Sequence, residues 1–250
     1  MSESLDNLKQ MLDGCTDAER AALIDYLRER LPKHSLESEW GVGSEIMLSA
    51  ISRSSDLTKR GLRGIIAEAV FEKSVLAGVM GWERVDFAGD RAYDFLIRSL
   101  GENSREVRIQ VKLQRTLKGQ PMWASQAKRD YPKDAYVVEV QKTRSGFHRV
   151  TKKATRPYEF GEFDILAVAM HPSTHDWNRF MFSLGNWLIP LSSDKALVEI
   201  FQPVAPVTTG GWTDSLETCL EWLAAGEQKT IFNITPKFHK RRAKKRKRAR

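Results

Sequence analysis

Two short stretches decide the fold of this chain: RAYDFLI at residues 91–97 and EVRIQVKL at residues 106–113. Both alternate apolar and polar side chains with a period of two, which is typical of β-strands buried on one face. The polar segment LGENSR at residues 100–105 predicts a turn between them. If the strands pair, Asp94, Gln110 and Lys112 gather on one face of a hairpin, while Phe95 and Val111 point to the other.

A carboxylate, an amide oxygen and an ammonium group on one face have a chemical use. Mg²⁺ takes oxygen ligands, often one or two carboxylates together with waters and phosphate oxygens. Asp94 can supply a carboxylate and Gln110 a neutral carbonyl oxygen. Lys112 can hold or deprotonate an attacking water, or neutralise charge that builds on a phosphate.

A third ligand is expected from the helix that the sequence predicts over residues 57–73. A broad apolar stripe has helical spacing there, and its members are Leu62, Ile65, Ile66, Ala69, Val70 and Leu76. Glu68 lies at the edge of this stripe, so a helix packed on the hairpin could aim its carboxylate at the metal. Glu72, one turn further on, is the competing choice, and its neighbours indicate a more solvated position.

Glu68 on a leading helix, Asp94 on a strand and Gln110-x-Lys112 on the next strand resemble the PD-(D/E)XK nuclease superfamily. Two positions depart from the usual pattern: Tyr93 replaces the proline before the acidic residue, and Gln110 replaces Glu or Asp. The second change removes one negative charge, although some members keep a Gln-x-Lys strand. The motifs cover roughly residues 60–115, and the fold that they imply extends to about residue 205.

The resemblance implies an α/β fold with a mixed central β-sheet flanked by helices, the restriction-endonuclease-like core. It implies Mg²⁺-dependent hydrolysis of double-stranded DNA, with Mn²⁺ as a possible substitute, and it favours a sequence-specific type II restriction endonuclease. Glu68, Asp94 and Gln110 would bind the metal and Lys112 would complete the catalytic set. A homodimer would suit a symmetric DNA site, and a cognate DNA methyltransferase would be a functional partner.

Other interpretations stay open at this point. A Holliday-junction resolvase, or a homing or repair nuclease, would share the site but cut a different target. A non-catalytic DNA-binding protein with a degenerate nuclease site is favoured by Gln110. Taken singly, Gln110 and Lys112 also suit the solvated face of an ordinary antiparallel sheet. Asp94 is less ordinary in a strand, because Asp is depleted from strands and is costly to bury unpaired.

Composition bounds these alternatives. The chain has 250 residues, of which 41% are hydrophobic and 29% charged, so it can bury a sizeable core and suits a globular protein. No stretch is apolar enough for a membrane helix, and the first residues lack the pattern of a signal peptide. The two cysteines, Cys15 and Cys219, suit neither a disulfide framework nor a zinc cluster. A reducing prokaryotic cytoplasm is the expected compartment, or the nucleus in a eukaryote, because residues 244–248 read KKRKR.

The net charge of +8 comes from the last residues of the chain. Residues 237–250 hold ten of the 40 basic side chains and no acidic one, which leaves 30 basic and 32 acidic residues before them. Such a block favours polyanions, so double-stranded DNA is the expected partner. A solubilising terminus is the plainer alternative. The side chains expected to contact DNA are Arg115, Lys118, Lys128, Arg129, Lys152, Lys153, Arg241, Arg242, Lys244 and Lys245.

The chain is expected to divide into an N-terminal helical segment (1–40), a nuclease-like domain (41–236) and a polybasic tail (237–250). Two helices are predicted within residues 4–31, with a capping box at Thr16 and Glu19, and a short helix within 44–52. Further strands are predicted at 135–140, 163–169, 179–184 and 187–191, and a helix near 215–225. His171 and His175 are interpreted as structural, because Pro172 argues against a helix that would present both to one metal.

Overall fold

The computed structural model describes residues 3–31, 33–147 and 154–232. The chain divides into two compact units, residues 1–59 and residues 60–250. The division falls further along the chain than the boundary expected after residue 40, and the helix α5 (Asp56–Val70) runs across it. The polybasic tail lies outside the described residues.

The first unit is helical. It contains α1 (Glu3–Gly14), α2 (Asp17–Arg30), α3 (Ser35–Trp40) and α4 (Ser44–Arg53). The predicted capping box is present, because the Thr16 side chain accepts the backbone N–H of Glu19 and the Glu19 carboxylate accepts that of Thr16. The helix α3 was not predicted. None of the described side chains in this unit is buried.

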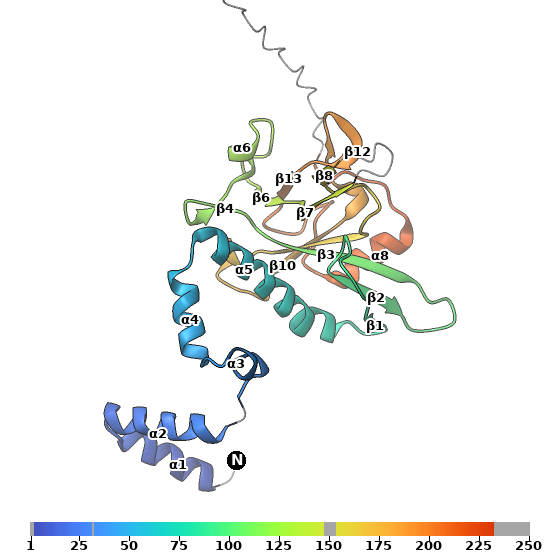
Figure 1. Ribbon diagram of the computed structural model, residues 1–250. Coiled ribbons are helices and arrows are strands. Elements are labelled where there is room, and N and C mark those ends of the chain that lie inside the picture. Colours follow the sequence, from blue (N-terminus) through green and yellow to red (C-terminus); the bar gives the residue numbers. More distant parts are fainter. Residues whose placement is uncertain (1–2, 32, 148–153, 233–250) are drawn as a thin grey trace, which may run out of the picture. The chain divides into compact units, whose positions relative to one another are not determined.

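The second unit is mixed α/β and is built on a five-stranded sheet of order β1-β2-β3-β9-β10 (Figure 1). The strands are β1 (Trp82–Val85), β2 (Phe95–Ser99), β3 (Glu106–Leu113), β9 (Ile165–Ala169) and β10 (Phe180–Leu184). β1, β2 and β3 run antiparallel, β9 is parallel to β3, and β10 is antiparallel to β9. The predicted hairpin is therefore confirmed, as is the central, fully buried strand β9.

A cluster of phenylalanines holds α5 to one face of this sheet. The α-helix passes at Phe71 into a π-helical turn (Phe71–Val75), and the buried Phe71 ring lies 5.3–6.3 Å from the rings of Phe95, Phe180 and Phe182. In Figure 1, α5 runs along the sheet beside these strands. Because Phe95 pairs with Ile109 in register, this face is the one opposite Asp94, Gln110 and Lys112.

Smaller elements complete the second unit. Three antiparallel pairs join strands that follow one another in the chain: β4 (Thr116–Leu117) with β5 (Gln120–Pro121), β7 (Gln141–Phe147) with β8 (Ala154–Pro157), and β11 (Pro190–Leu191) with β12 (Asp194–Val198). A fourth antiparallel pair joins strands that are far apart in the chain, β6 (Tyr136–Glu139) and β13 (Phe201–Val204). The helices are α6 (Ala124–Ala127), α7 (His171–Thr174) and α8 (Leu216–Ala225), with 3₁₀ turns at Leu76–Gly78 and Gly185–Trp187.

Two sequence predictions need correction here. The strand expected over 187–191 begins only at Pro190, because the chain first makes the 3₁₀ turn Gly185–Trp187. Pro172 does not prevent a helix at the histidines, since it occupies the first turn of α7, where its missing N–H leaves no helical bond unmade. His171 lies in that helix and His175 ends it in a left-handed conformation.

Candidate functional site

Asp94 stands where the β2–β3 ladder ends. β2 begins at Phe95, and the backbone N–H of Asp94 makes the last ladder bond, to the carbonyl of Ile109 at 3.0 Å. The pairing of β2 with β3 ends there, at Phe95 and Ile109, so the N–H of Val111 needs an acceptor other than β2. The Asp94 carboxylate supplies it at 2.8 Å. An acidic residue at the end of the strand is thus explained by backbone chemistry before any catalysis is considered.

Gln110 is directly opposite Asp94 and is only 1% exposed. Its amide nitrogen donates to the Asp94 carboxylate and to the carbonyl of Val111, the latter at 3.1 Å. Its amide oxygen accepts the hydroxyl of Tyr158 at 3.2 Å. Every polar group of this buried side chain therefore has a partner, and the nitrogen, rather than the oxygen, faces Asp94.

Tyr158 is the neighbour that sequence reasoning missed. It is 4% exposed and lies 48 positions from Gln110 in the chain, just after β8. The ammonium groups of Lys112 and Lys142 each lie 5.6 Å from the centre of its ring. No spacing or motif in the sequence connects Tyr158 with the hairpin, since the contact depends on how the segment between β3 and β9 folds back.

The two lysines at this ring differ in their partners. Lys142 pairs with the carboxylate of Glu162 at 2.7 Å. Lys112 has no direct ion pair among the described residues, and it is half-buried. Burial lowers the pKa of Lys112, while the charges of Asp94 and Glu68 act in the opposite direction. The negative charges that act on the half-buried Lys112 ammonium are thus those of Asp94 and Glu68, the two predicted metal ligands with a carboxylate.

Glu68 couples electrostatically to the same cluster from α5. Burial, and then the negative charge of Asp94, raise its pKa to about 7, while the charge of Lys112 lowers it. Burial also raises the pKa of Asp94, against the effects of Lys112, of the Val111 N–H and of Gln110. The described structure therefore brings together all four residues predicted for the site. The charges of Glu68, Asp94 and Lys112 influence one another around the buried Gln110 amide.

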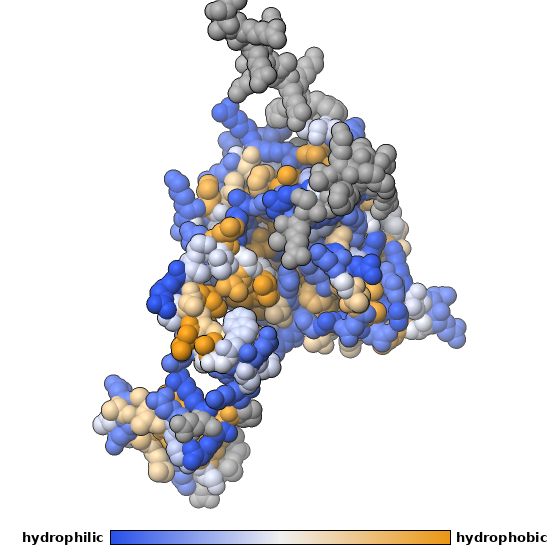
Figure 2. Space-filling model, viewed as in Figure 1, coloured by the Kyte–Doolittle hydropathy of each residue, from blue (hydrophilic) through white to orange (hydrophobic). Residues whose placement is uncertain are grey.

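The face of α5 that packs on the core was predicted only in part. Of the expected apolar stripe, Ile65 and Ile66 are solvent-exposed, at 61% and 43%, whereas Val70 and Leu76 pack against the core from partly buried positions. The fully buried residues of α5 and its continuation are Ala67 and Phe71, which the stripe did not include. Figure 2 shows hydrophobic surface in the region of α5. Glu68 is half-buried, and it lies three residues, about one helical turn, before the fully buried Phe71.

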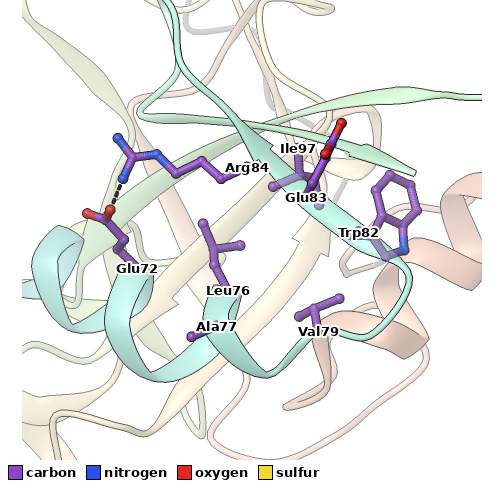
Figure 3. A pocket seen from close by; sticks show the side chains of 8 residues that line it. All are labelled: Glu72, Leu76, Ala77, Val79, Trp82, Glu83, Arg84 and Ile97. Atoms are coloured by element: carbon purple, nitrogen blue, oxygen red, sulfur yellow. Dashed lines mark ion pairs between the residues drawn. The ribbon is translucent and has the colours of Figure 1, made fainter. Parts of the chain in front are cut away.

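Glu72, the competing choice, is used elsewhere. Its carboxylate forms an ion pair with Arg84 of β1. Both side chains line a pocket of about 350 Å³ between the end of α5 and the strands β1 and β2, together with Leu76, Ala77, Val79, Trp82, Glu83 and Ile97. Figure 3 shows Glu72 and Arg84 directed toward one another across this pocket. Glu72 is not among the groups that shift the pKa of Glu68 or that of Lys112.

The expected DNA-contacting residues have varied environments. Arg115 forms an ion pair with Glu139, and Lys128 pairs with the buried Glu199 at 2.5 Å. Lys118 is exposed at the tip of the β4–β5 turn, where its φ is +50°. Arg129 is exposed after α6. Lys152, Lys153, Arg241, Arg242, Lys244 and Lys245 lie outside the described residues.

The donor set fits a hard divalent cation in kind. Glu68 and Asp94 offer carboxylate oxygens, and each is made harder to ionise by burial, which a bound cation would offset. Within the described ranges, however, no three His, Cys, Asp or Glu residues gather as a metal-binding group. Among the described residues the predicted site therefore has two carboxylates, and the predicted third ligand is the neutral amide of Gln110.

Comparisons of this chain with family models, with curated proteins and with solved structures found no match. None of the helices in the described part of the chain combines the length and the apolar character needed to span a bilayer.

Proposed function

We propose that this protein is a Mg²⁺-dependent nuclease that hydrolyses phosphodiester bonds of double-stranded DNA, with Glu68, Asp94, Gln110 and Lys112 as its active site. The observation that carries the proposal is the electrostatic coupling of Glu68, Asp94 and Lys112. Burial and the negative charge of Asp94 both oppose the ionisation of Glu68, which favours a cation between the two carboxylates, and perturbed groups of this kind cluster at functional sites.

The roles follow from each environment. Asp94 and Glu68 would hold Mg²⁺, and Mn²⁺ could substitute for it. Once bound, the cation would polarise the phosphate and stabilise the charge of the transition state. Glu68 has to lose its proton first, because its pKa is about 7 in the metal-free protein. Lys112 has a lowered pKa, so it can exchange a proton with the attacking water more readily than a solvated lysine.

Gln110 limits how the site can work. With its nitrogen toward Asp94 and its oxygen held by Tyr158, the amide presents no acceptor to the centre of the site. Turning the amide end for end would bring its oxygen toward Asp94. The Tyr158 hydroxyl could then accept the amide nitrogen, because a hydroxyl is both donor and acceptor. Tyr158 therefore suits either orientation of Gln110.

The finer assignment is a sequence-specific type II restriction endonuclease acting as a homodimer. Its support is the order of elements: a helix with Glu68, the antiparallel strands β1, β2 and β3, and then β9 parallel to β3. This order agrees with the restriction-endonuclease-like core expected from the motifs. A junction resolvase would share it, and plain duplex against branched DNA as substrate distinguishes the two.

One observation favours a second candidate, a DNA-binding protein without catalysis. The amide nitrogen of Gln110 already donates to the Asp94 carboxylate, and the site has only two carboxylates. The variant Gln110→Glu separates the candidates, because it restores the third carboxylate. A working nuclease should bind Mg²⁺ more tightly as Gln110→Glu and keep its activity. A non-catalytic protein should be inactive as the wild type and gain cleavage only as the variant, if at all.

The test of the proposal is cleavage of linear and supercoiled duplex DNA with and without Mg²⁺. Lys112→Met and Asp94→Asn should each lower the rate at least about 100-fold. Asn keeps an oxygen acceptor for the Val111 N–H, so the strand end should survive. Lys142→Met is the matched control, because Lys142 lies as far from the Tyr158 ring as Lys112 does but is paired with Glu162.

Wild-type activity should persist in Lys142→Met, and all variants should show native circular dichroism. If Lys112→Met and Lys142→Met lose activity equally, both lysines serve only to pack against the Tyr158 ring, and the catalytic assignment of Lys112 fails. If the wild type binds duplex DNA but cleaves none with either Mg²⁺ or Mn²⁺, the second candidate stands instead.

A further inference from the structure

Positive side chains that belong to different elements gather next to the proposed active site. Arg60 and Arg63 are exposed on the N-terminal half of α5. Arg115 lies two residues after the end of β3. His171 is the first residue of α7, which is bonded to the residue after β3, because the Gln114 side chain accepts the Ser173 N–H at 3.1 Å. We call Arg60, Arg63, Arg115 and His171 the α5 basic surface.

The electrostatics place these residues within range of one another. Burial, and then the positive charge of Arg60, lower the pKa of Arg115. Burial, His175 and Arg63 lower the pKa of His171, against a weaker effect of Asp176. Arg115 is already paired with Glu139, and the lowered pKa of His171 favours its neutral form, so the positive charges of this surface that an outside anion could neutralise are those of Arg60 and Arg63.

No carboxylate of the described chain relieves this repulsion at Arg60 or Arg63. Neither forms an ion pair among the described residues, whereas Arg84, Arg98 and Arg108 each pair with an acidic side chain. No acidic residue occurs between Asp56 and Glu68. Two exposed guanidinium groups without internal partners are free to bind an anion from outside the chain, and Arg matches phosphate geometry well.

The surface of α5 beside these arginines is bare. A Cβ atom at Gly61 or at Gly64 would have no heavy atom within 4 Å, so internal packing does not require glycine at either position. With no side chain at either residue, a ligand can approach the helix closely between Arg60 and Arg63. This observation adds to the charge argument and would carry nothing without it.

We infer that the α5 basic surface binds the sugar–phosphate backbone of the DNA strand that is cut, with Arg60 and Arg63 each contacting a phosphate. This inference rests on the proposed function, because it takes Glu68 as the point where the cut phosphate lies. α5 then acts as a guide that carries the metal ligand at one end and phosphate contacts at the other.

The helix geometry sets which phosphates are bound. An α-helix rises about 1.5 Å per residue, so Arg63 and Arg60 lie about 7.5 Å and about 12 Å from Glu68 along the axis. Successive phosphates of one strand advance about 3.4 Å along a duplex. The phosphates at Arg63 and Arg60 should therefore be about two and about three to four nucleotides from the cut bond, both on the same side of it.

The first test measures binding to a 30-base-pair duplex in EDTA, across a salt series, with the full chain. Each phosphate contact contributes about 0.9 to the slope of log affinity against log salt, so Arg60→Gln with Arg63→Gln should lower the slope by about 1.8. The matched control is Arg105→Gln, which removes a charge just before the opposite end of β3. Its slope should equal that of the wild type. An unchanged slope in the double variant overturns the inference.

The second test places single neutral methylphosphonates in the cut strand. Those two to four nucleotides to one side of the cleaved bond should weaken the wild type and leave the double variant unaffected, as a double-mutant cycle requires. The inference is overturned if the wild type and the double variant are equally sensitive to the methylphosphonates, or if the double variant loses as much binding to poly-glutamate as to DNA. The outcomes also separate the two proposals: salt-dependent binding through the arginines without any cleavage retains this surface and rejects the nuclease. Cleavage with an unchanged slope does the reverse.

Discussion

Asp94 serves two functions that are normally separate. Its carboxylate completes the hydrogen bonding of Val111 at the end of the β2–β3 ladder, and it also adds negative charge to an enclosed site. The backbone bond holds the carboxylate in one place, and it partly offsets the effect of burial on the Asp94 pKa. The carboxylate is thus held by the main chain at Val111 and by the amide of Gln110 together.

Glu68 should make the metal-free protein less stable as the pH rises. Its pKa is about 7 when folded, because of burial and then Asp94, whereas an unfolded Glu titrates near about 4.3. Between these values the folded state holds a proton that the unfolded state releases, so stability is lost as pH rises through that window. Glu68→Gln should therefore exceed the wild type by about 1 kcal/mol at pH 8, after a discount for solvent screening, and lose this advantage at pH 4.

Urea unfolding in EDTA at pH values from 4 to 8 checks this. Glu72→Gln is the control, since it removes the ion pair with Arg84 and should be no more stable than the wild type at pH 8. Added Mg²⁺ should stabilise the wild type at pH 8 and leave Glu68→Gln nearly unchanged. Parallel pH profiles for the wild type and Glu68→Gln would contradict the raised pKa.

At this scale the sequence predicted the residues that depend on strand periodicity. Asp94, Gln110 and Lys112 share a face because side chains alternate, and a hairpin with a polar turn leaves little freedom in register. Tyr158 could not be predicted in the same way. Its contact with Gln110 spans 48 positions and a set of short strands whose pairing no local pattern determines.

At the scale of elements, α5 shows why a helical stripe can mislead. Its most apolar positions, such as Ile65, are exposed, and its buried positions are the small Ala67 and the large Phe71. The side that packs is decided by the three phenylalanine rings of the sheet that receive Phe71, and these come from β2 and β10. Periodicity predicted that the segment is a helix, but the receiving surface decided its rotation.

The glycines of α5 allow a prediction about its stability. Gly64 is helical and a Cβ there would meet no heavy atom within 4 Å, so Gly64→Ala should stabilise the protein by about 0.5–1 kcal/mol. Gly185→Ala should do the opposite, because its Cβ would lie 2.7 Å from the carbonyl oxygen of Phe163. Chemical unfolding of both variants measures the change in the free energy of unfolding, which should rise for Gly64→Ala and fall for Gly185→Ala. Destabilisation by Gly64→Ala would mean that the helix is closely covered at that point.

For the whole molecule, the described hydrophobic core lies entirely in the second unit, from Ala67 to Ile231. Every residue of β9 is buried, so the sheet needs cover on both faces at this strand. The sequence predicted this strand from its continuous apolar run. It did not predict the division of the chain at residue 59, because α5 continues across that point without a break in helical pattern.

The charge of the whole chain leads to a prediction for association rates. Removing residues 237–250 deletes ten basic side chains and leaves 30 basic and 32 acidic residues. Long-range attraction to DNA should then weaken, so the association rate at low salt should fall at least about tenfold and depend less on salt. The choice of cleaved sequence should not change, because phosphate contacts position a protein but do not read bases. Stopped-flow binding and cleavage mapping test the two statements, and a shifted cleavage sequence would contradict the second.

The parallel pairing of β3 with β9 has a consequence for how the site assembles during folding. Asp94 and Gln110 are 16 positions apart, while Tyr158 and Gln110 are 48 apart, so the second contact closes a loop that costs about 1 kcal/mol more in chain entropy. The hairpin should therefore form early, and Tyr158 should reach the Gln110 amide only after β9 has joined β3. A contact made after the transition state affects unfolding rather than folding. Tyr158→Phe should accordingly speed unfolding and leave the refolding rate unchanged, which makes the orientation of one buried amide the last detail of this candidate site to be set.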